Sequence, residues 1–143
     1  MGTASENFNY REFERSATAD KKGIINIIHT VQVRDSIKAL VDEVLQPLRT
    51  AWGKPLVINS GYRCPELNKE VGGVPTSQHI KGEAADVACD DPYALAQLAY
   101  DHGLPYDQMI LYPTFVHFSH RLDGEQRGQI LYNRTYQGKR VKI

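Results

Sequence analysis

The sequence predicts one α+β domain in which helices pack on a small, mainly antiparallel sheet. Apolar residues recur at steps of three and four from Val33 to about Thr50, which indicates a long amphipathic helix. Two short apolar segments with strand-like patterns occupy 108–112 and 115–120. Pro113 lies between them and favours a turn, so we expect two adjacent antiparallel strands.

Local patterns predict the other elements of the first half of the chain. A short helix is expected over 9–17, followed by a polar turn over 19–25. Pro47 removes a hydrogen bond late in the long helix and is expected to kink its last turn. Gly53 ends that helix, and a short buried strand is expected over 56–58.

Local patterns also predict the helices and strands of the second half of the chain. A helix that begins at a proline is expected over 65–70, because proline is favoured at the first helical position. A buried strand over 84–88 and a helix over 92–102 follow. The final polar segment, 121–143, is expected to be a basic tail apart from an edge strand over 129–133.

Length and composition limit the class of protein. The chain has 143 residues, enough to bury one core, and neither a repeat nor a linker divides it, so we expect a single domain over 1–143 with its core at about 8–120. Lysine plus arginine and aspartate plus glutamate both number 17, so no net field favours nucleic acid or an anionic membrane. We therefore expect neither nucleic acid nor a membrane as a partner. We also expect the protein to be a monomer. Cys64 and Cys89 are expected to be two thiols.

No segment resembles a signal peptide, and no apolar run is long enough to span a bilayer. Synthesis is therefore expected to end in the cytoplasm.

His79 and Asp86 are the first candidate residues for chemistry. On one strand their odd spacing would direct them to opposite faces, and on one helix they would stand roughly 10 Å apart along the axis. A turn near Lys81 and Gly82, followed by the strand over 84–88, would bring the two side chains together. The two alanines before Asp86 would leave room for an ion.

His117 is the best candidate for a third ligand. It lies in the predicted strand over 115–120 and shares a face with Phe115 and Ser119. Two histidines and a carboxylate suit catalytic zinc, which keeps a position for water and lowers the pKa of that water to about 7. A histidine on a strand also has ordinary structural roles, so the spacing leaves both interpretations open.

A ten-residue pattern around His79 and Asp86 gives further evidence for a metal site. The segment 77–86 has the form S-x-H-x-x-G-x-A-x-D. It resembles the signature of the zinc D-Ala-D-Ala carboxypeptidase family, which includes the vancomycin-resistance dipeptidases and phage L-alanyl-D-glutamate endolysins and shares its fold with hedgehog signalling domains. The resemblance covers about 8–120 and points to the small branch often carried by phages and prophages. The matching residues are Phe8, Glu12, Phe13, Ser16, Pro47, Leu48, Arg49, Ser60, Gly61, Tyr62, Arg63, Asn68, Gly72, Gly73, Ser77, His79, Gly82, Ala84, Asp86, Tyr106, Asp107 and Gln108.

The resemblance implies a zinc site and its ligands. His79, Asp86 and His117 would hold Zn²⁺, which we expect at the exposed end of the sheet. The substrate implied is a peptidoglycan stem peptide.

The resemblance also implies residues that bind the substrate. Arg63 would polarise the scissile carbonyl or hold a substrate carboxylate, and an ion pair with Glu66 or Glu70 is the alternative for this arginine. Ser77 and Gln78 would contact the polar end of the substrate.

One part of the family pattern is missing. Enzymes of the family place an acid three residues before the last histidine, or at the end of the preceding strand, but these positions hold Thr114 and Tyr112. His120, Asp107 and Glu83 are the candidate substitutes for the general base. Of these, His120 is expected to point to the face opposite His117 unless the strand ends or bulges.

These features predict zinc-dependent hydrolysis of an amide bond in stem peptides, as a D-Ala-D-Ala carboxypeptidase or an endolysin-like peptidase. The missing acid leaves two alternatives: a non-catalytic, zinc-stabilised module that binds wall peptides or a protein partner, and a phage structural protein that keeps only the fold. Without a signal peptide, the protein would reach the wall after lysis, through a holin-type hole or on a phage particle.

Overall fold

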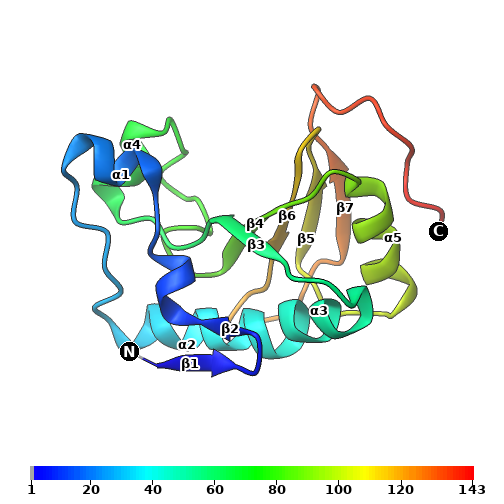
Figure 1. The fold of residues 1–143 in the computed structure, drawn as a ribbon, viewed down its shortest axis with the longest axis horizontal. Coiled ribbons are helices and arrows are strands. Elements are labelled where there is room, and N and C mark those ends of the chain that lie inside the picture. The colour runs from blue at the N-terminus through cyan, green and yellow to red at the C-terminus, as the bar shows by residue number, and fades with distance from the viewer. Residues whose placement is uncertain (1) are drawn as a thin grey trace.

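The computed structural model describes residues 2–143 and confirms the α+β class (Figure 1). Within these residues the main sheet has the order β3-β4-β6-β5-β7, and all neighbours are antiparallel except β5 and β7. A separate hairpin joins β1 and β2. The strands are β1 (Thr3–Ser5), β2 (Phe8–Asn9), β3 (Val57–Ser60), β4 (Ala84–Ala88), β5 (Gln108–Leu111), β6 (Phe115–Ser119) and β7 (Gln129–Tyr132).

Helices cover one face of this sheet and flank its β3 side. Figure 1 shows α5 against the strands β5 to β7, the α2 to α3 segment along the base, and α1 beside α4 on the other side of the molecule. The helical elements are η1 (Tyr10–Phe13), α1 (Ala17–Lys22), α2 (Val31–Leu40), η2 (Val41–Leu45), α3 (Gln46–Trp52), α4 (Pro65–Glu70) and α5 (Pro92–Asp101).

The long amphipathic helix predicted from Val33 to about Thr50 is present as the continuous segment α2-η2-α3. The effect of Pro47 was predicted wrongly in detail, because the irregular turn lies before the proline and not in the last turn. The Gln46 N–H bonds the carbonyl of Val41, five residues back, so η2 is a π-helical turn. Proline has no N–H for the regular ladder, and the wider turn precedes the position where that bond is missing.

The N-terminal prediction was also partly wrong. The expected helix over 9–17 is the short 3₁₀ helix η1, and the expected turn over 19–25 is occupied up to Lys22 by α1. Asn9 and Glu12 form a reciprocal capping box that supports only one turn. Ser16 then caps α1 by accepting a hydrogen bond from the Ala19 N–H.

The core lies between the sheet and the α2-η2-α3 and α5 helices. Alternate residues of the central strands turn their side chains to this face and are fully buried. The residues between them face outward, and most of these are partly exposed. The buried strand residues are Ala85, Val87, Met109, Leu111, Val116 and Phe118. Cys64 and Cys89 are both free thiols, as predicted.

The edge strand predicted over 129–133 forms as β7, paired in parallel with β5. The chain then returns to α5. The Val141 side chain is buried, its N–H bonds the Tyr132 hydroxyl, and the Lys142 N–H bonds the Gln97 side chain. These contacts attach the last residues to the domain.

Candidate metal centre

His79 is held by the turn predicted near Gly82. Gly82 has φ 76°, a left-handed conformation that glycine adopts without strain, and it packs against the backbone of Val33. The His79 ring is buried, and its Nδ1 lies 2.7 Å from the carbonyl oxygen of Gly61. A carbonyl only accepts hydrogen bonds, so Nδ1 carries the proton and Nε2 faces the sheet.

Gly61 itself has no space for a side chain. A Cβ at this position would lie 2.7 Å from the Cα of Phe13 in η1. This close packing sets the position of the carbonyl that orients His79.

Asp86 and His117 face each other across two neighbouring strands. They are paired in the β4-β6 register, so their side chains leave the same, outer face of the sheet. Each is the central residue of its five-residue strand. The expectation of a site at the exposed end of the sheet was therefore wrong: register places it at mid-strand, on the face not covered by the core helices.

The three predicted ligands converge at this point. One donor atom from each of His79, Asp86 and His117 lies within 4.8 Å of the other two. Oδ1 of Asp86 is 2.9 Å from Nδ1 of His117 and 3.4 Å from Nε2 of His79. Burial alone would raise the pKa of the Asp86 carboxyl, but His117, which is hydrogen-bonded to it, and His79 beside it outweigh burial and hold this pKa well below its usual range.

The donor set fits a metal ion. With Nδ1 bonded to Gly61, a neutral His79 turns the lone pair of Nε2 toward the Asp86 carboxylate, and two acceptors that face each other need a cation between them. The bond from Nδ1 to a backbone carbonyl is also the usual support of a metal-bound histidine. Two imidazoles and a carboxylate form a donor set that zinc accepts.

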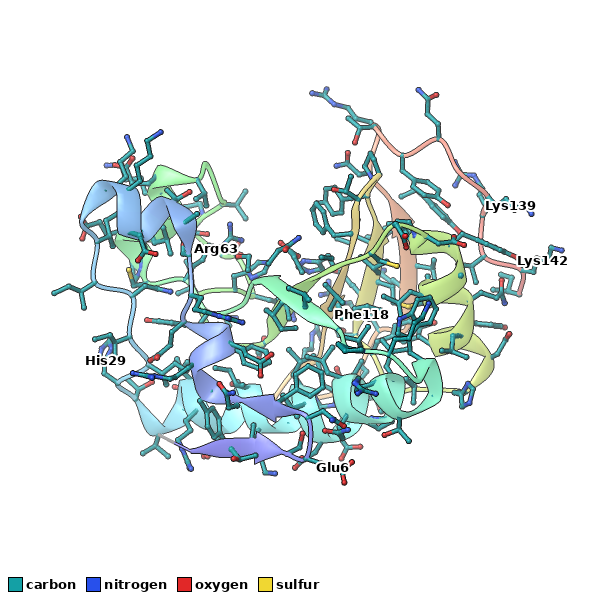
Figure 2. All side chains as sticks on the ribbon, viewed as in Figure 1. Glu6, His29, Arg63, Phe118, Lys139 and Lys142 are labelled. Atoms are coloured by element: carbon teal, nitrogen blue, oxygen red, sulfur yellow. The ribbon has the colours of Figure 1, made fainter. Side chains whose placement is uncertain are left out.

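Arg63 lies beside this cluster. Its backbone N–H bonds the carbonyl of His79, and its guanidinium donates to the Ser77 hydroxyl at 3.3 Å. Figure 2 shows Arg63 next to β3, with His29 at the outer edge of the α1 and α4 side. The alternative ion pairs do not form among residues 2–143: neither Glu66 nor Glu70 contacts the guanidinium.

The side chain of Arg63 is half-buried and incompletely bonded. Burial lowers the pKa of its guanidinium, whereas the charge of Asp86 opposes this change. Its Nε is buried and has no hydrogen-bond partner within residues 2–143. A buried donor of this kind is costly unless a ligand satisfies it.

The family of the chain follows from comparison with known proteins. A family model described as Peptidase M15 matches residues 6–119. This chain belongs to the peptidase M15 family. A similar protein is the zinc D-Ala-D-Ala carboxypeptidase of Streptomyces albus G, which is 37% identical over 86 residues, 58% of this chain and 34% of that protein. The M15 chain thus spans about a third of the length of this curated relative.

Asn26 is a residue of the M15 chain that the sequence analysis missed. Its buried amide donates to the carbonyls of Glu14 and Tyr62 and accepts from the Cys64 N–H, so it holds the backbone on both sides of Arg63. The available signal was one amide side chain within the apolar segment 24–28.

Gln78 was predicted to bind substrate, but its amide nitrogen has two partners within the M15 fold. It lies 3.3 Å from Glu83 Oε1 and 3.2 Å from Asp107 Oδ2. Asp107 is fully buried and held by Arg127, and the Glu83 carboxylate accepts the Leu122 N–H. This polar network occupies both acids that were candidates for the general base.

His120 lies apart from the metal centre. The charges near its ring are Glu43, Asp107 and Glu83, and burial lowers its pKa. The structure therefore does not bring this candidate base to the three ligands. This agrees with the expectation that His120 points to the strand face opposite His117.

A cavity of about 720 Å³ is lined mainly by polar and charged residues that include Gln78, Glu83 and Arg127, and by none of the three ligands. Within residues 2–143 no helix is both long and apolar enough to cross a membrane.

Proposed function

We propose that this chain is a zinc-dependent peptidase that hydrolyses an amide bond in peptidoglycan stem peptides. The observation that supports it most is the convergence of His79, Asp86 and His117 beside an incompletely bonded arginine. The zinc D-Ala-D-Ala carboxypeptidase from Streptomyces agrees with both the metal and the substrate class.

The three ligands and Arg63 have separate tasks in this proposal. His79, Asp86 and His117 hold the zinc ion, which supplies a polarised water when bound. Arg63 donates hydrogen bonds to the substrate, either at a terminal carboxylate or at the scissile carbonyl oxygen as negative charge develops there.

Ser77 has a supporting task. Its hydroxyl accepts hydrogen bonds from the His79 N–H and from Arg63, so it joins the turn that holds a ligand to the arginine that binds substrate. We assign no substrate contact to Gln78 and no proton transfer to His120, because each lies in the environment of Asp107.

The decisive experiment measures metal content and hydrolysis on one purified sample. Peptidoglycan sacculi and a pentapeptide that ends in D-Ala-D-Ala are incubated with the protein, and the products are identified by mass spectrometry. We expect release of alanine or a stem fragment, loss of activity on chelation and recovery with zinc. His79→Ala is expected to abolish tight zinc binding, whereas His29→Ala, a change to an exposed histidine, is the control. Stoichiometric zinc with unchanged affinity in His79→Ala would contradict the ligand assignment.

Amidating the C-terminus of the pentapeptide separates the two tasks of Arg63. If the arginine holds a terminal carboxylate, KM rises strongly for the amide. If it binds the scissile carbonyl oxygen, both peptides react similarly and Arg63→Lys lowers kcat for both.

A second candidate function is a zinc-stabilised module that binds wall peptides without cleaving them. It is favoured by the absence of an available carboxylate at the positions considered for the general base. Asp107 and Glu83 are engaged in other hydrogen bonds, and Thr114, which is exposed in the turn before β6, is not an acid. Bound zinc and peptide affinity without product from either substrate would support this function.

A further inference from the structure

Tyr112 directly follows β5, at a position where related enzymes were expected to carry an acid. Ile110 is paired with His117 in the β5-β6 register, so Tyr112, two residues further on, leaves the same outer face. It is the diagonal neighbour of His117 across the strand pair. Diagonal neighbours lie about 7–8 Å apart, within reach of an aromatic side chain.

The ring of Tyr112 is held in place by its neighbours. It stacks on Phe115 with 4.1 Å between centroids and 13° between planes. The Tyr112 N–H bonds the carbonyl of Phe115, which fixes the backbone at the same pair. The side chain therefore has a defined direction over the outer face of the sheet.

Asn133 follows β7 beside the end of β5. Its N–H bonds the carbonyl of Leu111, and its Oδ1 accepts the N–H and hydroxyl of Thr135. Asn133 lowers the pKa of the Tyr112 phenol, which is the effect of a hydrogen-bond donor. A nitrogen donor occupies a lone pair of the phenol oxygen and leaves its O–H available to donate.

Two charged groups of the site, Asp86 and Arg63, act on the phenol of Tyr112. Burial raises the pKa of its phenol, the Asp86 carboxylate raises it further, and the Arg63 guanidinium opposes this. The phenol is therefore protonated at neutral pH and serves as a hydrogen-bond donor.

We propose that Tyr112 is a catalytic residue of this site, which donates its phenol hydrogen bond to the oxygen of the scissile amide as negative charge develops there. The inference rests on the proposed peptidase function and adds a second hydrogen-bond donor to Arg63. No proton leaves Tyr112 in this role, and the carbonyl oxygen is its acceptor.

The test compares Tyr112→Phe with the unaltered protein, both loaded with zinc. Phenylalanine keeps the stack on Phe115 and removes only the hydroxyl. Tyr100→Phe, a change to an exposed tyrosine of α5, is the matched control. We expect kcat on the pentapeptide to fall about 10²-fold in Tyr112→Phe, with KM, zinc content and melting temperature nearly unchanged.

A second measurement separates this proposal from the proposed function. A phosphinate analogue of D-Ala-D-Ala mimics the tetrahedral geometry of the reaction, and its affinity is measured by calorimetry. Tyr112→Phe should bind it at least about tenfold more weakly while binding D-Ala-D-Ala itself as well as the unaltered protein does. An active protein in which Tyr112→Phe keeps kcat within twofold would overturn the role of Tyr112 alone. A zinc-loaded protein that neither cleaves the peptides nor binds the phosphinate would overturn both proposals.

Discussion

Asp107→Asn tests the buried polar network behind the metal centre. The Asp107 carboxylate is fully buried and accepts the Arg127 guanidinium at 2.6 and 3.0 Å, the Arg127 backbone N–H at 2.8 Å and the Gln78 amide at 3.2 Å. Burial alone would raise the pKa of this carboxyl, but the hydrogen bonds from Arg127 lower it from 3.8 to about 2. The folded state therefore favours the ionised form.

The pKa shift sets the size of the expected effect. One pKa unit corresponds to about 1.4 kcal/mol, so the shift from 3.8 to about 2 corresponds to about 2 kcal/mol of folding free energy. Because the folded pKa is the lower one, this stabilisation is fully present above the unfolded pKa. It is lost as the pH falls from about 4 to about 2. Asparagine resembles the neutral carboxyl, so Asp107→Asn should lose about 2 kcal/mol at pH 7.

Urea denaturation between pH 7 and pH 2 measures this difference. The free energies of unfolding of the two proteins should differ by about 2 kcal/mol at pH 7 and converge as the pH falls to about 2. Asp123→Asn, a change to an exposed carboxylate nearby in the chain, is the control and should cost little. A constant difference between Asp107→Asn and the unaltered protein over this pH range would refute the reasoning, because the carboxyl would then not be the titrating group.

Two further predictions concern the turn and the metal. Gly103→Ala should lower the free energy of unfolding by about 1–2 kcal/mol, because this residue has φ 61° but open space around it. Gly82→Ala should lower it clearly more, because φ is also positive there and the added Cβ would lie 2.7 Å from the Val33 carbonyl oxygen. Thermal unfolding of both variants checks the order, and equal losses would contradict the close packing. Zinc at about 100 times its Kd should stabilise the protein by about 2.7 kcal/mol, since only the folded chain gathers the three ligands. In His117→Ala this stabilisation should disappear, and an undiminished rise in melting temperature with zinc would remove His117 from the ligand set.

Local patterns predicted the elements that depend on nearby residues. The helix over 65–70 and the strand over 84–88 occur with the predicted bounds, because a proline start and a run of small and β-branched residues are local signals. The helix α1 was missed because its cap, Ser16, follows the short 3₁₀ turn that the Asn9 and Glu12 capping box stabilises. The position of the π-helical turn depends on how the whole α2-η2-α3 segment packs.

The site was predictable in part for the same reason. His79, Gly82 and Asp86 lie within eight positions, and a turn followed by a strand was the economical way to join them. Asn26 was not recognised, because its three hydrogen bonds reach Glu14, Tyr62 and Cys64, each distant in the chain.

The sequence by itself determined the long amphipathic helix, the left-handed glycine turn and the residue types that suit zinc, since each depends on a local pattern. Only the tertiary structure decided that Asp86 lies opposite His117, 31 positions away, and that Tyr112 is the diagonal neighbour of His117. Strand alternation gives two faces but no register. The register is set when the buried side chains of β4, β5 and β6 pack against the helices, and that packing places the outward residues at mid-strand.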